Sequence, residues 1–148
     1  MTTARSSDGH GPGGFRRQWR FYRTAAGREP VREFLDDDRL ADEDAARIAA
    51  AMVEVRTHGR AHPDVNHLRG DIWQIEIDGR RAIYRLFFAE EGRFSQVLLA
   101  LEIINKKWQK AKNPHIELAE ARLADWRARG RTDAVERPSR TTSGRGSG

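Results

Sequence analysis

The chain has 148 residues, 38% of them hydrophobic and 33% charged, and a formal net charge of +5. This length predicts one domain with a modest core, and the positive charge favours a polyanionic partner such as nucleic acid or an acidic protein. The chain has no cysteine, which excludes disulfides and thiolate metal sites. No apolar run approaches the roughly 18 residues of a membrane span, and no apolar secretory segment begins the chain, so we expect a soluble cytoplasmic protein that does not enter membranes.

The two ends of the chain contain few apolar residues. Residues 1–14 are rich in Ser, Thr, Gly and Asp, and residues 131–148 are rich in Arg, Ser, Thr, Gly and Pro. Such segments bury too little apolar surface to offset the entropy that ordering costs. The sequence therefore predicts a disordered N-terminal segment, a folded domain over residues 15–130 and a disordered basic tail.

A short basic strand and a helix are expected at the start of the domain. Trp19 and Phe21 lie among arginines, which is typical of an edge strand. Pro30 suits the first turn of a helix over residues 30–37. The three aspartates at positions 36–38 are interpreted as a solvated helix end, because adjacent carboxylates do not converge on one metal ion.

The apolar spacing over residues 43–58 predicts a second helix, with Asp42 as its N-cap and Gly59 as its C-cap. Three histidines lie at its end and in the connection that follows: His58, His62 and His67. Gly59 and Pro63 interrupt any continuous helix that would present them together, and no cysteine completes a zinc set. The sequence therefore predicts no metal site and no cofactor.

Three strand-like runs follow, over residues 72–77, 82–88 and 95–104. Apolar and polar residues alternate in them, with the period of two that half-buried strands show. One face is expected to pack on the two helices through Trp73, Ile75, Tyr84, Leu86, Leu99, Leu101 and Ile103. The other face is expected to be polar and to carry Gln74, Glu76, Arg85 and Glu102. A cluster of lysines follows the last strand.

A last helix is expected to begin at Pro114 and to end at Gly130. With it, the elements follow the order β-α-α-β-β-β-α. This order predicts a single α+β domain, in which a mainly antiparallel sheet packs on the two N-terminal helices.

Four stretches of the sequence resemble motifs of the RelE/ParE toxin superfamily, and most closely those of its HigB-like, phage-derived branch. They are REPVREFL at residues 28–35, LRGDIWQIEI at 68–77, AIYRLFF at 82–88, and INKKWQKAKNP followed by IELAEARL at 104–123. The four stretches occur in the order and spacing of the family motifs. The resemblance implies a RelE-like fold over roughly residues 19–129.

The resemblance also implies a function, that of the toxin of a type II toxin–antitoxin system. HigB-like and RelE-like members are endoribonucleases, called mRNA interferases, which cleave mRNA in the ribosomal A site without a metal and so inhibit translation. The expected partners are mRNA on the ribosome and a cognate antitoxin, often a helix-turn-helix protein. ParE-like members share the fold but poison gyrase.

The sequence departs from the family pattern at three positions on the polar face. Gln74 stands where Glu is usual, Glu76 where an Arg belongs, and Glu102 where a His is common. Arg85 and the lysine pair after the last strand are kept. Two alternatives to the nuclease therefore remain: a catalytically eroded protein of the same fold that binds RNA or the antitoxin, and a ParE-like gyrase inhibitor.

Metal-free RNA cleavage needs a base for the 2′-hydroxyl, cations for the phosphorane and an acid for the leaving oxygen. Arg85, on a central strand, suits two phosphate oxygens at once; the alternative is a cross-strand salt bridge with Glu76 or Glu102. These two carboxylates and a lysine are the candidate bases. The expected catalytic residues are Arg85, Lys106, Lys107, Glu76 and Glu102, and the expected RNA-binding residues are Lys110, Lys112, Trp108, Arg80 and Arg81.

Overall fold

The computed structural model of the protein describes residues 17–107 and 113–147, with side chains up to residue 130. The elements in chain order are β1 (Gln18–Phe21), α1 (Pro30–Leu35), α2 (Asp42–His58), the 3₁₀ turn η2 (Gly59–Ala61), β2 (Val65–Arg69), β3 (Ile72–Asp78), β4 (Ile83–Glu91), β5 (Val97–Asn105) and α3 (Asn113–Ser147). The predicted order is confirmed, with β2 as an additional strand.

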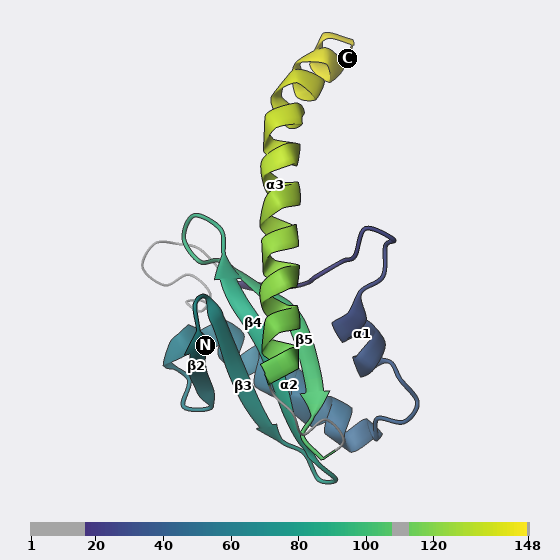
Figure 1. Cartoon of the computed structure of the whole chain (residues 1–148), viewed down its shortest axis with the longest axis vertical. Coiled ribbons are helices and arrows are strands. Elements are labelled where there is room, and N and C mark those ends of the chain that lie inside the picture. Colours follow the sequence, from purple (N-terminus) through teal and green to yellow (C-terminus); the bar gives the residue numbers. More distant parts are fainter. Residues whose placement is uncertain (1–16, 108–112, 148) are drawn as a thin grey trace, which may run out of the picture.

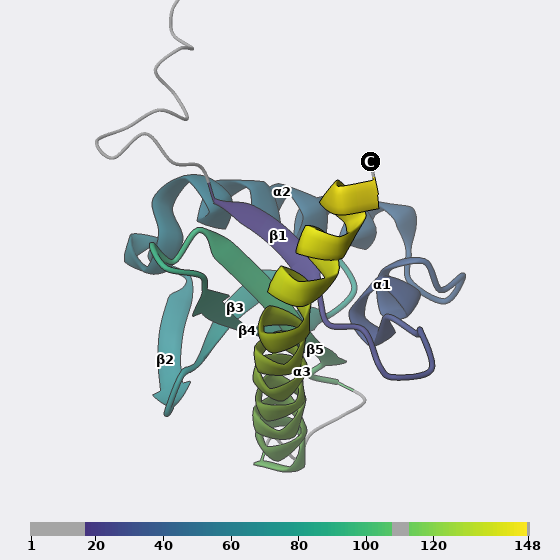
Figure 2. The ribbon, with the colours of Figure 1, turned by 90° about the horizontal axis from the view of Figure 1, so that it is seen from above.

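The five strands form one sheet in the order β1-β5-β4-β3-β2. Only β1 runs parallel to its neighbour, β5, and the other three pairings are antiparallel. Helices cover both faces: α1 and α2 lie on one side of the sheet, and α3 lies on the other (Figures 1 and 2). The predicted α+β class and the packing on the two N-terminal helices are confirmed, whereas the cover that α3 provides was not predicted.

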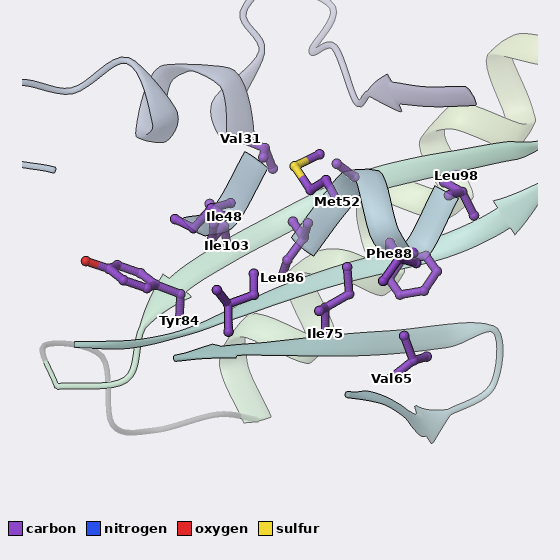
Figure 3. Packing of buried hydrophobic residues seen from close by; sticks show 13 residues of the cluster. Val31, Ile48, Met52, Val65, Ile75, Tyr84, Leu86, Phe88, Leu98 and Ile103 are labelled. Carbon is purple, nitrogen blue, oxygen red and sulfur yellow. The ribbon is translucent and has the colours of Figure 1, made fainter. Parts of the chain in front are cut away.

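The face under α1 and α2 carries one of two hydrophobic clusters (Figure 3). Its buried members come from both helices and from four strands: Val31, Ile48, Met52, Val55, Val65, Ile75, Ile77, Tyr84, Leu86, Phe88, Leu98, Ala100 and Ile103. Trp19 packs against this cluster, and its indole N–H donates to the backbone oxygen of Met52 at 2.7 Å, so β1 is fixed to α2. The predicted core roles of Trp73 and Tyr84 are confirmed, since Tyr84 is buried and Trp73 packs against the cluster half-buried.

The second cluster lies between the sheet and α3. Its members on α3 are Ile116, Ala119 and Leu123, which follow helical spacing and meet Phe87, Leu99 and Leu101 of the sheet. The prediction that Leu99 and Leu101 face the N-terminal helices together with Ile103 is therefore wrong.

A β-bulge explains this error. Phe87 pairs with Glu102, but the next residue, Phe88, pairs with Ala100, so Leu101 is an extra residue in β5. An extra residue shifts the alternation by one position. As a result Leu99 and Leu101 face α3, while Ala100 and Ile103 face the other side.

The helix ends differ from the predictions: α1 ends at Leu35 rather than at residue 37, and α3 begins at Asn113 rather than at Pro114. Ala41 occupies the N-cap position of α2 and Asp42 is its first residue, whereas Gly59 caps the other end with φ of 62° as predicted. The sequence predicted the end of the last helix at Gly130, but α3 continues to Ser147 and projects beyond the sheet (Figure 1). The predicted disorder of residues 131–148 stays a prediction. A helical glycine costs about 1 kcal/mol relative to alanine, mainly in backbone entropy, and this cost alone does not end a helix. The predicted N-terminal segment, residues 1–14, lies outside the described residues.

Candidate functional site

The four polar residues predicted to share one face do so, on the side of the sheet that α3 covers. The pairing across β3, β4 and β5 forms two neighbouring rows, Glu76–Arg85–Ile104 and Gln74–Phe87–Glu102. Because residues on adjacent strands of one row point to the same side, the polar residues form a compact group. We call Gln74, Glu76, Arg85 and Glu102 the polar patch.

Arg85 lies at the centre of the polar patch on β4, which has a hydrogen-bonded strand on each side. Its side chain is 15% exposed, and its Nε lies 3.6 Å from Oε1 of Glu76. That distance is too long for a hydrogen bond, and within the described part of the chain the buried Nε has no hydrogen-bond partner. The predicted cross-strand pair with Glu76 therefore exists, but it leaves donor capacity on the guanidinium for an anion.

Gln74 is the most buried member of the polar patch, at 4% exposed. Its Oε1 also has no hydrogen-bond partner among the described residues. A buried acceptor on Gln74 and a buried donor on Arg85 thus lie in neighbouring rows, and neither has a partner in the described part of the chain. Such atoms are rare in native proteins and mark places where a ligand or water can bind.

Glu102 is engaged by the helix above it. Nδ1 of His115 lies 2.8 Å from Oε2, and an Arg122 nitrogen lies 3.3 Å from Oε1. The backbone N–H of Ile103 also donates to Oε1 at 3.2 Å, and Arg122 donates to the backbone oxygen of Leu101 at 2.7 Å. These contacts occupy about three of the four acceptor positions of the carboxylate, so Glu102 is poorly suited to act as a free base.

The lysine pair lies at the end of β5, beside the start of β4. The backbone N–H of Lys106 donates to the oxygen of Ile83 at 2.8 Å, and that of Lys107 donates to Oδ1 of Asn105 at 2.8 Å. These bonds continue the β4–β5 pairing by one step, so both lysines lie close to the row that contains Arg85, and their side chains are exposed. The other predicted residues of this stretch, Trp108, Lys110 and Lys112, lie outside the described residues.

The β3–β4 hairpin is attached to α2 by the buried carboxylate of Asp44, and these contacts were not predicted from the sequence. Asp44 accepts the backbone N–H groups of Arg80 at 2.6 Å and Arg81 at 3.2 Å, and the hydroxyl of Tyr84 at 2.7 Å. Burial alone would raise the pKa of Asp44, but these hydrogen bonds hold it below its usual value. Burial, and then the bond to Asp44, raise the pKa of Tyr84 well above its usual value.

This anchor sets the place of the two predicted RNA-binding arginines. A Cβ on Gly79 would lie 2.7 Å from the Tyr84 ring and 2.8 Å from the Asp44 carboxyl carbon, so only glycine fits the hairpin there. The Arg80 guanidinium contacts Glu43 at 3.0 Å in an exposed ion pair, which costs little to break. The hairpin tip therefore presents two exposed arginines, but not within the polar patch.

A groove of about 430 Å³ opens on the other side of Glu76, between α2 and the end of β3. Its lining includes four carboxylates, Glu54, Asp64, Glu76 and Asp78, and one cation, Arg47. Like charges repel a phosphate backbone, so a nucleic acid on the polar patch is expected to approach from the lysine side.

The three histidines near the end of α2 do not converge on one point: the rings of His58 and His62 lie 6.1 Å apart, centroid to centroid, and His67 contacts another part of the chain. His62 lies 2.8 Å from Oε1 of Glu54, and Nε2 of His67 lies 2.7 Å from the backbone oxygen of Gly70. Among the residues that the structure describes, no group of three or more histidine and acidic side chains could hold a metal ion. The described helices also include none that is both long and apolar enough to cross a membrane.

The fold defines a small α+β domain compatible with the RelE-like fold, in which the lysine pair follows β5 two positions beyond the partner of Arg85. The family model of the phage-derived, Gp49-like proteins matches residues 35–124, which is more than half of the chain. The chain belongs to this family of Gp49-like phage-derived proteins, a family of the RelE-like toxin type. A search of curated proteins with this chain found no match.

The match includes the polar patch, the lysine pair and the first turns of α3. It supports the toxin–antitoxin context that the motifs predicted, and with it an antitoxin as partner. The contacts of Asp44 and His115 could not be predicted from the sequence, because the partners of each residue lie far away in the chain. The only sequence signal was that Asp44 and His115 each lie in the first turn of a helix, which is not specific.

Proposed function

We propose that this protein is the toxin of a type II toxin–antitoxin system and that it cleaves mRNA on the ribosome without a metal ion. The observation that carries this proposal is Arg85. It is a rigid arginine on a central strand, with a buried donor that has no partner in the described structure, beside two exposed lysines. Membership of a toxin-type family supports the same proposal.

In the proposed reaction, Arg85 stabilises the charge that develops on the phosphorane. Its planar guanidinium can donate to two phosphate oxygens at once, and its low exposure makes each bond stronger than it would be in water. The loose contact with Glu76 holds the guanidinium in place without using its donors fully. Lys106 and Lys107 are proposed to bind the flanking phosphates, since their side chains are exposed.

The proposed partners are an mRNA in the ribosomal A site and a cognate antitoxin of the helix-turn-helix type. The net charge of +5 suits both RNA and an acidic antitoxin. Arg80 and Arg81 at the hairpin tip, together with Trp108, Lys110 and Lys112, are proposed to extend the contact with RNA. A gene for a small helix-turn-helix protein beside this one would support the antitoxin assignment.

A second candidate function is a binding protein of the same fold without nuclease activity. The observation that favours it is Glu102, whose carboxylate is occupied by contacts with α3 rather than free for chemistry. Such a protein would keep the basic surface for RNA or for the antitoxin, but it would not cleave.

Controlled expression in a bacterial host, with growth measurement and mapping of mRNA 5′ ends, tests these candidates. The nuclease proposal predicts growth arrest and new ends within translated messages. Arg85→Ala should lose about 2–4 kcal/mol of transition-state stabilisation and so cleave more slowly, while a thermal melt should show that it stays folded. Arg39→Ala, which removes an exposed arginine paired with Asp37, is the matched control and should cleave as wild type does.

Three results would contradict the nuclease proposal. Growth arrest with DNA damage and intact messages would indicate gyrase poisoning. An absence of toxicity would favour the binding protein. A folded Arg85→Ala protein that remains fully toxic would remove Arg85 from catalysis.

A further inference from the structure

We propose that His115 is the general base of the cleavage reaction and that Glu102 positions it; this inference rests on the proposed function. Nδ1 of His115 lies 2.8 Å from the Glu102 carboxylate. His115 belongs to the first turn of α3, which covers the sheet face that carries the polar patch. It therefore brings a histidine to a site for which sequence reasoning considered only carboxylates and lysine as bases.

The contact with Glu102 sets which nitrogen of His115 is free. A carboxylate accepts hydrogen bonds, so the Nδ1 that it contacts carries the proton in the neutral ring. Nε2 then holds the lone pair that can accept a proton. The side chain is 23% exposed, so the ring is accessible while its orientation is fixed.

Glu102 is itself held in place from two other directions. Arg122, one helical turn further along α3 than Ala119, donates to Oε1 and to the backbone of Leu101, where the β-bulge lies. The N–H of Ile103 donates to the same oxygen. Because these contacts fix Oε1, the other oxygen, Oε2, stays directed to His115. The bulge and the helix thus together define the position of the imidazole.

The register places Glu102, which contacts His115, diagonal to Arg85. Glu102 and Arg85 occupy diagonal positions on neighbouring strands, since Arg85 pairs with Ile104, two residues after Glu102. Diagonal neighbours lie about 7–8 Å apart, and a histidine on the Glu102 carboxylate lies above the same surface. A phosphate bound by Arg85 therefore brings the 2′-hydroxyl of its nucleotide within reach of His115.

The proposed step balances with the groups named. Nε2 of neutral His115 takes the proton of the 2′-hydroxyl as the O2′–P bond forms and the P–O5′ bond breaks. The products are a 2′,3′-cyclic phosphate and a 5′-alkoxide, which takes a proton from water; the resulting hydroxide takes the proton back from the imidazolium. Glu102 stabilises the imidazolium in between, and Arg85 stabilises the negative charge on phosphorus oxygens.

The histidine is favoured over the two carboxylates for physical reasons. Glu102 has most of its acceptor positions occupied, and Glu76 lies beside the Arg85 guanidinium and borders the acidic groove. Among the charged groups on the elements packed there, Glu102 on β5 contacts His115, and Arg122 on α3 contacts the same carboxylate. Arg85 on β4 and Glu76 on β3 lie on the same sheet face, and Lys106 follows the end of β5. A base limb between pH 5 and 8 is typical of histidine among these residue types.

The test is the pH profile of single-turnover cleavage of a ribosome-bound message by full-length wild type and His115→Asn. Asparagine can keep the donor to Glu102 but has no Nε2 equivalent. We expect a folded variant whose cleavage falls by about 100-fold or more and whose pH profile has lost the rising limb between pH 5 and 8. His67→Asn, which changes an exposed histidine on the opposite sheet face, is the matched control and should behave as wild type.

Each outcome supports or overturns the assignment. If wild type does not cleave, the proposed nuclease function itself fails. If wild type cleaves and folded His115→Asn cleaves equally well, the function stands and His115 is only a contact between α3 and β5. If His115→Asn does not fold, the wild-type profile decides: a rate that does not rise between pH 5 and 8 overturns the histidine base. Glu102→Gln should also lower the rate and shift the limb, as expected for a positioning residue.

Discussion

Replacing Asp44 by alanine should destabilise the protein strongly, because this carboxylate connects the β3–β4 hairpin to α2. Asp44 is fully buried and accepts hydrogen bonds from the Tyr84 hydroxyl and from the backbone of Arg80 and Arg81. Hydrogen bonds to a charged acceptor contribute about 1.5–3 kcal/mol each. The two backbone groups belong to an exposed turn and can bind water after the change, whereas the buried Tyr84 hydroxyl cannot. We therefore expect a loss of about 3–4 kcal/mol in the free energy of unfolding.

Urea unfolding at pH 7, followed by circular dichroism, measures this loss. Glu43→Ala is the matched control, since Glu43 is the preceding residue of α2 and forms an exposed ion pair with Arg80 at 3.0 Å. Such pairs contribute less than about 1 kcal/mol, so its midpoint should hardly move. An Asp44→Ala protein within about 1 kcal/mol of wild type would refute the role of Asp44 as an anchor of the hairpin.

Three further predictions concern the pH dependence of stability, the core and RNA binding. Because folding lowers the pKa of Asp44, its charged form stabilises the protein above about pH 4, and this stabilisation is lost as the pH falls through the folded pKa. The difference in free energy of unfolding between wild type and Asp44→Asn should therefore shrink in acid. A difference that stays constant with pH would contradict the lowered pKa of Asp44. Leu101→Ala, at the fully buried bulge, should lower the free energy of unfolding by about 2–5 kcal/mol, whereas Leu118→Ala, at an exposed position of α3, should change it little. Equal melting temperatures of the two variants would contradict the packing of α3 on the sheet. Lys106→Ala should weaken RNA or ribosome binding mainly at low salt, and an effect that is the same at high salt would exclude a phosphate contact.

The ends of the chain give one more prediction. Residues 1–14 and 131–148 should be dispensable for folding, because they contain few apolar residues. A chain trimmed to residues 15–130 should show a cooperative melt close to that of the full chain. A trimmed chain that fails to fold would show that the projecting part of α3 stabilises the domain.

Alternation of apolar residues was sufficient to predict β3, β4 and β5 and the shared face of the polar patch. It failed at Leu101, because one inserted residue shifts the pattern without changing the composition. It also missed β2, an edge strand whose middle residues, Asn66 and His67, are polar and exposed. Edge strands are often of this kind, since one side is open to water and charged or polar side chains discourage further pairing.

The residues of the polar patch were predicted from the sequence, but the contacts that α3 makes with them were not. The polar face suggested an open surface, and the sequence gives no sign that α3 would cover it, because its apolar residues fit either face of the sheet. Glu102 and His115 are 13 positions apart in the chain, and Asp44 is 40 positions from Tyr84. Contacts of this kind are determined by packing and register, which local patterns do not specify. The position of Arg85 on the polar face, in contrast, could be predicted from the sequence, because its neighbours Tyr84 and Leu86 are apolar and face the opposite side of β4.

The central proposal is cleavage of ribosome-bound mRNA through attack by the 2′-hydroxyl on the phosphate bound at Arg85. A reconstituted translation system can present two messages that differ only in one nucleotide, with ribose in one and 2′-deoxyribose in the other at the cleaved position. The proposal predicts that the protein cuts the all-ribose message to a 2′,3′-cyclic phosphate and a 5′-hydroxyl, and leaves the 2′-deoxy message intact. Cleavage of both messages, or of neither, would contradict it.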